Sequence, residues 1–205
     1  MRSKPSHARI VVDEAHATGV FGPEARGLVV QLGLEAEIDV VIGTRGRALR
    51  SYDAFASCSR TMADYLINRA RTLIFSTALP PPSLGAALEA LRLLREEPDL
   101  VARLHANARA LRDELAASGF AVEPATMPII PLIVGDPQAA LALCEHALRE
   151  GIFAQAIRPP TVPDGTSRLR LVATAGHDEA DLRAARTLAA CARDLAGEPT
   201  GAPAA

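Results

Sequence analysis

Short apolar runs alternate with amphipathic segments along the chain, which is the pattern of a mixed α/β protein. In the first half, the apolar runs predict strands at residues 8–12, 40–43, 54–57 and 73–76. Helical spacing predicts helices at residues 60–71, 83–94 and 100–118, with Ser83 as the N-cap of the second and Gly119 ending the third. The first strand begins almost at the start of the sequence, yet a buried parallel strand needs neighbours on both sides. We therefore expect a fragment of a larger sheet, or a partner chain that completes it.

The pattern changes after Gly119, where strands become more frequent. We predict strands at residues 120–123, 129–134, 152–156 and 168–174, and helices at residues 137–150 and 178–195. The fold class is α/β. We divide the chain into three parts. Residues 1–97 hold strands of a larger sheet with a helical connector, and residues 98–196 form a small α+β domain. Residues 197–205 are a disordered tail rich in small residues and prolines.

Composition excludes several functional classes. The 205 residues carry a formal net charge of −2, which gives no electrostatic attraction to nucleic acid or to an anionic membrane. No apolar run approaches the ~18 residues of a membrane span, and the basic N-terminus lacks the apolar core of a signal peptide. Three widely spaced cysteines fit neither a disulfide framework nor a metal site. We expect a cytoplasmic protein with buried free thiols and no metal.

The string DEAHATG follows the first predicted strand, so Asp13 and His16 lie at its carboxyl end, where open α/β sheets bind ligands. An acidic pair at this position also occurs in the magnesium site of nucleotide-hydrolysing enzymes and helicases. That interpretation needs a phosphate-binding loop of the form GxxxxGK[ST], which this sequence lacks. A turn capped by Asp13 is the simplest structural alternative.

Four segments give DEAHATG a more specific meaning. They read VVDEAHATGVFGPEARG, DVVIGTRGRALRSYDAF, INRARTLIFSTALPP and GIFAQAIRPPTVPDGTSRLRL. In this order they resemble the α-oxoamine synthases, a family of pyridoxal 5'-phosphate (PLP) enzymes of fold type I, from about residue 10 to residue 195. The resemblance implies the C-terminal part of the PLP-binding large domain followed by a small α+β domain. The IRPPTVP motif points to the branch that condenses L-alanine with a pimeloyl thioester, with loss of CO₂, in biotin biosynthesis.

The resemblance also implies roles for individual residues. Asp13 matches the carboxylate that keeps the pyridine nitrogen of PLP protonated, which lets the ring absorb carbanion charge. His16 matches the histidine that hydrogen-bonds the phenolic oxygen of the cofactor, and Thr44 matches a hydroxyl that binds its phosphate. For His16, a structural role in the turn is the alternative.

Three further positions concern the substrate and the partner subunit. Thr77 matches a hydroxyl that reaches the phosphate of a neighbouring subunit, which implies a dimer. A simple loop-start hydroxyl is an equal alternative. Arg170 matches the arginine that grips the substrate carboxylate, for which a planar two-pronged donor is suited. A solvated charge at a strand edge is its alternative, and Thr161 lies in the substrate-side loop. His105, His146 and His177 have no motif around them, and we expect them at the surface.

The chain departs from the family pattern at the cofactor lysine. Where the family has Gly-Thr-Leu-Gly-Lys-Ala-Leu-Gly-Ser-Tyr-Gly-Ala, this sequence reads GTRGRALRSYDA, so Arg47 replaces the lysine that forms the Schiff base. A guanidinium stays protonated and can neither attack the aldehyde nor move a proton. Arg50 and Asp53 replace two glycines of this loop. Glycine there usually permits a positive φ, so we expect distortion.

Length is the second departure, because the family's subunit is roughly twice as long. The absent half would carry much of the sheet, so we expect exposed apolar edges at Val11 and Val41. Three hypotheses follow. The chain is an inactive relative of the family, or a non-catalytic subunit that forms a homodimer or pairs with a full-length paralogue, or a module that binds PLP or a carboxylate, with Arg47 pairing with Asp13.

Overall fold

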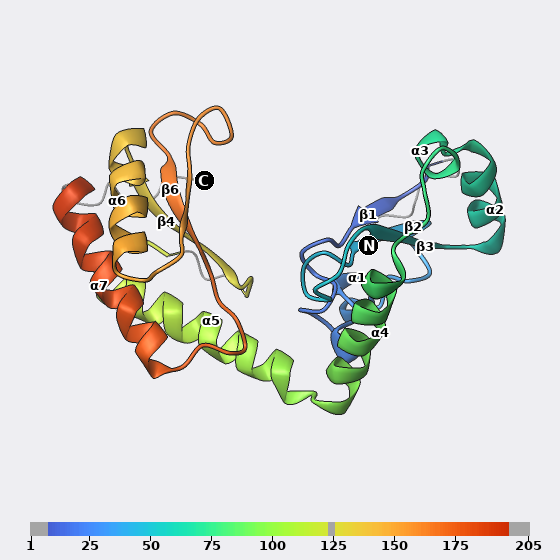
Figure 1. Ribbon diagram of the computed structural model, residues 1–205, viewed down its shortest axis with the longest axis horizontal. Helices are drawn as coiled ribbons and strands as arrows, with labels where there is room; N and C mark the ends of the chain where they lie inside the picture. The colour runs from blue at the N-terminus through green and yellow to red at the C-terminus, as the bar shows by residue number, and fades with distance from the viewer. Residues whose placement is uncertain (1–7, 123–125, 197–205) are drawn as a thin grey trace. The chain divides into compact units, whose positions relative to one another are not determined.

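The computed structural model describes residues 8–122 and 126–196, apart from the side chains of residues 195 and 196. The chain divides into two compact units, Met1–Val101 (unit 1) and Ala102–Ala205 (unit 2). Each unit holds one three-stranded sheet (Figure 1). The tail predicted at residues 197–205 lies outside the described residues. Within the described part, no helix is both long and apolar enough to cross a lipid bilayer.

The sheet of unit 1 has the order β1-β2-β3. Its strands are β1 (Val11–Asp13), β2 (Val40–Thr44) and β3 (Ala54–Cys58). β1 and β2 are parallel, with Val11 opposite Val40, whereas β2 and β3 are antiparallel. The segment between β1 and β2 contains the 3₁₀ helix η1 (Pro23–Ala25) and the short helix α1 (Leu28–Gln31), neither of which the apolar pattern predicts.

Helices follow the sheet of unit 1. They are α2 (Arg60–Arg69), α3 (Arg71–Ile74) and α4 (Pro81–Glu96), followed by α5 (Asp99–Ala117), most of which belongs to unit 2. Ser59 caps α2, and its hydroxyl accepts a hydrogen bond from the backbone N–H of Met62 at 3.3 Å. α4 begins two residues before the predicted N-cap Ser83, with prolines in its first turn, where the missing N–H is not needed.

The strand predicted at residues 73–76 is wrong. Residues 71–74 form the helical turn α3 instead, in which Ile74 N–H donates to the carbonyl of Ala70 and Phe75 N–H to that of Arg71, both at 3.0 Å. A short apolar run cannot be assigned to strand or helix by periodicity alone. The backbone hydrogen bonds to the end of α2 decide in favour of the helix.

Unit 2 is an antiparallel sheet with the order β4-β6-β5 and with helices packed against it. The elements are β4 (Ile129–Gly135), α6 (Pro137–Arg149), β5 (Gln155–Ile157), β6 (Ser167–Val172) and α7 (Glu179–Ala196). Residues 120–122 are not a strand as predicted, and residue 123 lies outside the described part. The predicted strand at residues 152–156 is β5, which begins three residues later and is short.

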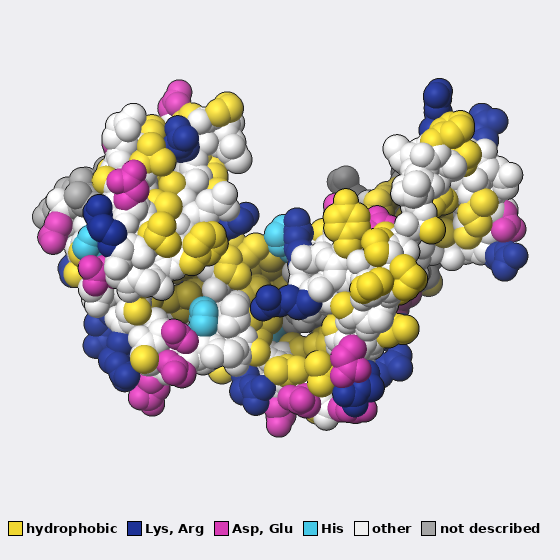
Figure 2. All heavy atoms as spheres, in the orientation of Figure 1, with side chains coloured by type: hydrophobic (Ala, Val, Ile, Leu, Met, Phe, Trp, Pro, Cys, Tyr) yellow, Lys and Arg dark blue, Asp and Glu magenta, His cyan; other side chains and the backbone are white. Residues whose placement is uncertain are grey.

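The continuous hydrophobic core lies in unit 2. Its fully buried large side chains include Leu115, Ile130, Leu132, Leu143, Leu169 and Leu188. Unit 1 buries mainly small side chains and leaves large ones in water, including Phe75 at 78% exposure and Leu88 at 68%. Hydrophobic side chains on the visible face of α2, α3 and α4 are exposed in Figure 2. Unit 1 by itself therefore leaves much apolar surface uncovered.

Candidate functional site

Asp13 and Thr44 lie at one edge of the unit 1 sheet. Asp13 ends β1 and Thr44 ends β2, and the parallel pairing of these strands brings their carboxyl ends together. The Thr44 hydroxyl donates to the carbonyl of Ala15 at 3.3 Å, which ties β2 to the turn after β1. The structure therefore brings together two of the residues predicted for the cofactor, at the edge where open α/β sheets bind ligands.

The Asp13 carboxylate is exposed and partly committed to the turn. Its Oδ1 accepts from the Ala15 N–H at 2.8 Å, whereas its Oδ2 has no hydrogen bond among the described residues. The capped turn that we gave as the alternative is thus present, and the second oxygen is still available to a ligand. His16 follows in the same turn with an exposed side chain.

Arg47 lies in the loop between β2 and β3, and its side chain is exposed. The backbone of this loop is closed by the Arg45 N–H to Asp53 O bond at 2.8 Å and the Ser51 N–H to Arg45 O bond at 2.9 Å. Within the described residues, Arg47 forms no ion pair with Asp13, so the pairing expected for a binding module is wrong. The carboxylate of Asp13 faces the turn of its own strand instead.

The same loop holds the two residues that replace family glycines. Arg50 has a φ of +47° and Asp53 a φ of +79°, both in the left-handed region that favours glycine. Both positions thus have a positive φ of the kind that glycine permits. The backbone keeps that conformation although both residues carry a Cβ, so the loop contains local strain.

Thr77 lies between α3 and α4 in unit 1 and is exposed. Among the described residues its hydroxyl has no hydrogen-bond partner, and its carbonyl accepts from the Ser76 hydroxyl at 3.4 Å. Nothing within unit 1 joins Thr77 to Asp13 or Thr44. Its role at a neighbouring subunit stays a prediction.

Arg170 and Thr161 belong to unit 2. Arg170 is exposed on β6, opposite Gln155 of β5, and its Nη2 donates to Gln155 Oε1 at 3.0 Å. The remaining guanidinium donors of Arg170 point to no other partner in the described chain and can accept a carboxylate in a two-pronged manner. Thr161 is an exposed loop residue whose N–H donates to the carbonyl of Arg158 at 3.1 Å.

Sequence reasoning missed Gln155 and Glu14. Gln155 holds Arg170 through strand register, and nothing in the segment GIFAQAIRPP, in which it lies, indicates Arg170 as its partner. Glu14 is only 3% exposed, and its Oε1 accepts from the Val29 N–H at 2.6 Å, which satisfies the start of α1. A Cβ at Gly27 would lie 1.8 Å from Glu14 Oε2, so glycine is required there. The two neighbouring carboxylates thus differ in role: Asp13 is accessible to a ligand, whereas Glu14 is buried and stabilises the start of α1.

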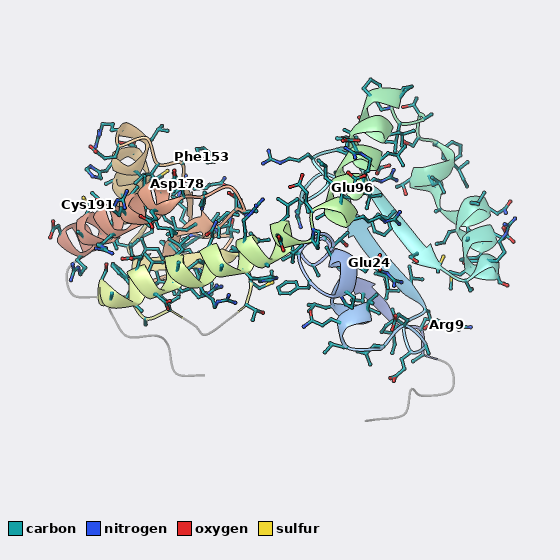
Figure 3. The ribbon with its side chains drawn as sticks, turned by 90° about the horizontal axis from the view of Figure 1, so that it is seen from below. Arg9, Glu24, Glu96, Phe153, Asp178 and Cys191 are labelled. Carbon is teal, nitrogen blue, oxygen red and sulfur yellow. The ribbon has the colours of Figure 1, made fainter. Side chains whose placement is uncertain are left out.

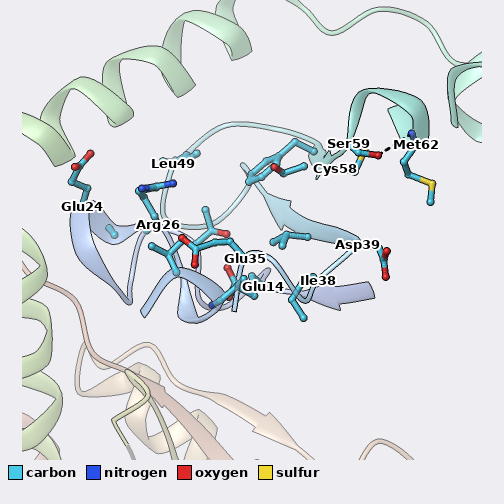
Figure 4. A pocket seen from close by; sticks show the side chains of 18 of the residues that line it. Glu14, Glu24, Arg26, Glu35, Ile38, Asp39, Leu49, Cys58, Ser59 and Met62 are labelled. Carbon is cyan, nitrogen blue, oxygen red and sulfur yellow. Dashed lines mark hydrogen bonds between the residues drawn. The ribbon is translucent and has the colours of Figure 1, made fainter. Parts of the chain in front are cut away.

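Unit 1 also contains a cavity of about 930 Å³ (Figure 4). Apolar side chains of the sheet and of α4 line it, including Val41, Phe55 and Leu91, and Glu14 and Arg26 add charge. Asp13, Thr44 and Arg47 are not among its lining residues. The cavity is therefore a hollow separate from the edge that carries the predicted cofactor residues.

The chemistry of these side chains can be tested against PLP. A carboxylate with a free oxygen can pair with a protonated ring nitrogen, and a threonine hydroxyl can donate to a phosphate oxygen. Among the described residues there is no primary amine, because the only lysine of the chain, Lys4, lies outside them. The residues present fit PLP held without a covalent bond, and they do not fit attachment through position 47.

Comparison with known proteins decides the family. A sequence model described as aminotransferase class I and II matches residues 2–187. The chain belongs to this family. The 8-amino-7-oxononanoate synthase of Anaeromyxobacter dehalogenans (strain 2CP-C) is 45% identical to it over 192 residues, which are 94% of this chain and 48% of that protein. This aminotransferase-family chain therefore spans about half the length of the curated relatives it matches.

Solved structures agree with this assignment. The 8-amino-7-oxononanoate synthase of Francisella tularensis superposes with a TM-score of 0.77 at 26% identity, covering 90% of this chain and 54% of that one. A lysine-to-alanine variant of the serine palmitoyltransferase from S. paucimobilis, solved with PLP and myriocin, superposes with a TM-score of 0.85 at 31% identity, covering 92% and 48%. The resemblance to the α-oxoamine synthases and the predicted α/β fold of a PLP-dependent transferase are confirmed.

Proposed function

We propose that the chain is the C-terminal half of a PLP-dependent acyltransferase of the 8-amino-7-oxononanoate synthase type, and that it binds PLP without a covalent bond. Asp13 carries this proposal, because its free carboxylate oxygen lies at the same sheet edge as Thr44. When bound, PLP supplies a ring that absorbs the negative charge left on an amino acid after it loses CO₂. Asp13 would keep the ring nitrogen protonated and His16 would face the phenolic oxygen. The Thr44 hydroxyl would exchange its hydrogen bond to the Ala15 carbonyl for one to the phosphate.

Arg47 makes the chain inactive by itself in the condensation of L-alanine with a pimeloyl thioester. Its guanidinium cannot act as the base that moves a proton at the reacting carbon. A lysine-to-alanine variant of serine palmitoyltransferase was solved with a bound PLP–myriocin aldimine, so one relative retains PLP although a lysine has been replaced. In unit 2, Arg170, held by Gln155, would bind the amino-acid carboxylate, with Thr161 in the adjacent loop.

The test compares two variants that both carry Lys4→Arg, which removes the only natural lysine. One keeps Arg47 and the other contains Arg47→Lys. We expect both to bind PLP, as a change in its visible absorption. After borohydride reduction, only the Arg47→Lys variant should gain a PLP adduct at residue 47 by peptide mass analysis. Asp13→Asn should weaken binding in both. Failure of either variant to bind PLP, or an Asp13→Asn variant that binds equally well, would contradict the proposal.

We further propose that unit 1 pairs with a full-length relative in an assembly to which Thr77 contributes. β1 pairs with β2 alone among the described strands, and Val11 on it is 56% exposed. On α4, Leu84, Leu88 and Leu91 recur at helical spacing and are all exposed. A polypeptide that supplies a further strand and an apolar face would bury these groups, as the roughly doubled length of the relatives suggests.

Co-expression with a tagged full-length 8-amino-7-oxononanoate synthase tests the pairing. We expect one peak in size-exclusion chromatography with the mass of a heterodimer, and its loss when Leu88→Glu places a charge on the apolar face of α4. Glu89→Gln, on the same helix, is the matched control and should leave the peak unchanged. Two independent peaks would contradict the pairing, and a mass of twice this chain alone would indicate a homodimer instead.

A further inference from the structure

Cys191 and His146 form a side-chain pair in unit 2. Cys191 lies on α7 and His146 on α6, and Sγ and Nε2 are 3.1 Å apart (Figure 3 labels Cys191). Both residues are half-buried. We expected His146 at the surface and the thiol of Cys191 to be buried, and the structure differs from both expectations. Cys191 also packs against the hydrophobic core, beside the buried Ala192. A thiol and an imidazole are thus held in contact between two helices.

The other two cysteines provide an internal comparison. All three are free and of intermediate exposure. The thiol of Cys144 donates to the carbonyl of Ala154 at 3.1 Å, a hydrogen-bond acceptor that is not a base. The thiol of Cys58 has no hydrogen-bond partner among the described residues. Cys191 is therefore the one described cysteine next to a group that can accept the thiol proton, and all three thiols are half-buried.

His146 lies in the last turn of α6, and its Nε2 is in contact with the thiol of Cys191. A base in hydrogen-bond contact with a thiol is the arrangement that activates cysteine as a nucleophile. Reaction requires the thiolate, and a free thiol is only about 3% ionised at neutral pH.

We propose that Cys191 is a modification site that reacts with low-molecular-weight disulfides, with His146 as its base. The imidazole takes the thiol proton, and the Cys191 sulfur attacks one sulfur of the disulfide. A new S–S bond forms as the original one breaks, and the released thiolate takes the proton from His146. No net oxidation occurs, because one disulfide replaces another.

Modification has a structural consequence in unit 2. The core cluster against which Cys191 packs includes the buried Leu188 and Ala192 on α7 and Leu143 and Ala147 on α6. A bulky group attached to a half-buried sulfur between these helices requires them to move apart, because cores do not accommodate additional volume without strain. The site therefore couples the thiol state of Cys191 to the packing of α6 on α7.

The reactivity test uses the full chain, glutathione disulfide as the disulfide, and limiting iodoacetamide as a second probe. Peptide mass analysis measures the three cysteines in one sample. We expect Cys191 to react about fivefold faster than Cys58, a modest fraction of the 10²-fold or more that a well-placed general base supplies, and Cys144 to be slowest. In His146→Gln, which keeps a polar side chain but no base, Cys191 should fall to the rate of Cys58, while the other two stay unchanged.

Equal reaction rates of Cys191 and Cys58 in the protein without substitutions would by themselves overturn the proposal. So would a His146→Gln protein in which Cys191 keeps its rate. A purely structural role for His146 is excluded when the variant keeps the circular dichroism of the unsubstituted protein while the reaction rate of Cys191 falls to that of Cys58. Hydrogen exchange of α6 and α7 peptides should accelerate after reaction at Cys191 and not after reaction at Cys58.

Discussion

The strained loop between β2 and β3 makes a quantitative prediction. Arg50 and Asp53 hold φ angles of +47° and +79°, and neither side chain has a hydrogen bond among the described residues that offsets the strain. Replacing each by glycine removes the Cβ that conflicts with the left-handed backbone. Replacing each by alanine removes the same side chain but keeps the Cβ. The difference between the glycine and alanine variants therefore isolates the backbone strain.

Two opposing terms set the size of this difference. A residue with a Cβ in the left-handed region costs about 1 to 2 kcal/mol. Glycine costs about 0.5 to 1 kcal/mol through the greater freedom of the unfolded chain. With the middle of each range, the glycine variant at each position should thus be more stable than the alanine variant by about 0.75 kcal/mol. Aspartate tolerates this region better than arginine, so we expect the larger effect of reverting to glycine at Arg50.

Hydrogen exchange read peptide by peptide is the suitable assay, because it separates unit 1 from unit 2. The Ser51 N–H to Arg45 O and Arg45 N–H to Asp53 O bonds close this loop. Exchange of the Ser51 and Arg45 amide hydrogens should be about two- to fivefold slower in the glycine variant than in the alanine variant. Exchange of the β4 and β6 peptides should be the same in both.

Gly46 in the same loop is the control. Its φ is not in the left-handed region, and an added Cβ would meet only the Ser51 carbonyl at 3.5 Å. Exchange in Gly46→Ala should therefore be equal to or slower than in the protein with Gly46. At positions 50 and 53, in contrast, alanine should exchange faster than glycine. Equal exchange in the glycine and alanine variants at both Arg50 and Asp53 would refute the strain argument.

Three further predictions concern packing and pH. Gly27→Ala should destabilise unit 1 by about 2 kcal/mol or more, because the added Cβ would collide with Glu14 and because residue 27 has a φ of +111°. Hydrogen exchange of the β1 and β2 peptides measures this loss of stability. Leu169→Ala should destabilise unit 2 by about 3 to 5 kcal/mol in urea titration, because Leu169 is fully buried. Backbone N–H donors of Asp181 and Ala180 lower the pKa of Asp178. The stability that the ionised carboxylate contributes at neutral pH should therefore be lost as the pH drops below about 4. Asp178→Asn should flatten this acidic part of the plot of stability against pH.

Local periodicity predicted most of the secondary structure. The apolar runs at residues 40–43 and 54–57 are β2 and β3, and the segment at residues 137–150 is α6. The pattern failed at residues 73–76, where four apolar or small residues fit a strand and a helical turn equally well. It also missed η1 and α1, whose start depends on the buried Glu14.

The candidate site was predictable only in part. A strand end indicated Asp13 and His16, and the family pattern indicated Thr44 and showed that Arg47 stands where a lysine is needed. Gln155 was not predictable, because it reaches Arg170 only through the register of β5 and β6. The proposed roles of His16, Thr77 and Thr161 stay predictions.

The sequence by itself determined which chemical groups this protein has. It contains a guanidinium in place of the reactive amine, carboxylates and hydroxyls at strand ends, and helices and strands whose periods are local properties of the chain. Tertiary structure decided which of these groups meet. Glu14 reaches Val29 across 15 residues and His146 reaches Cys191 across 45. Such contacts depend on strand register and helix packing, which arise from the simultaneous burial of many side chains and leave no local signal in the sequence.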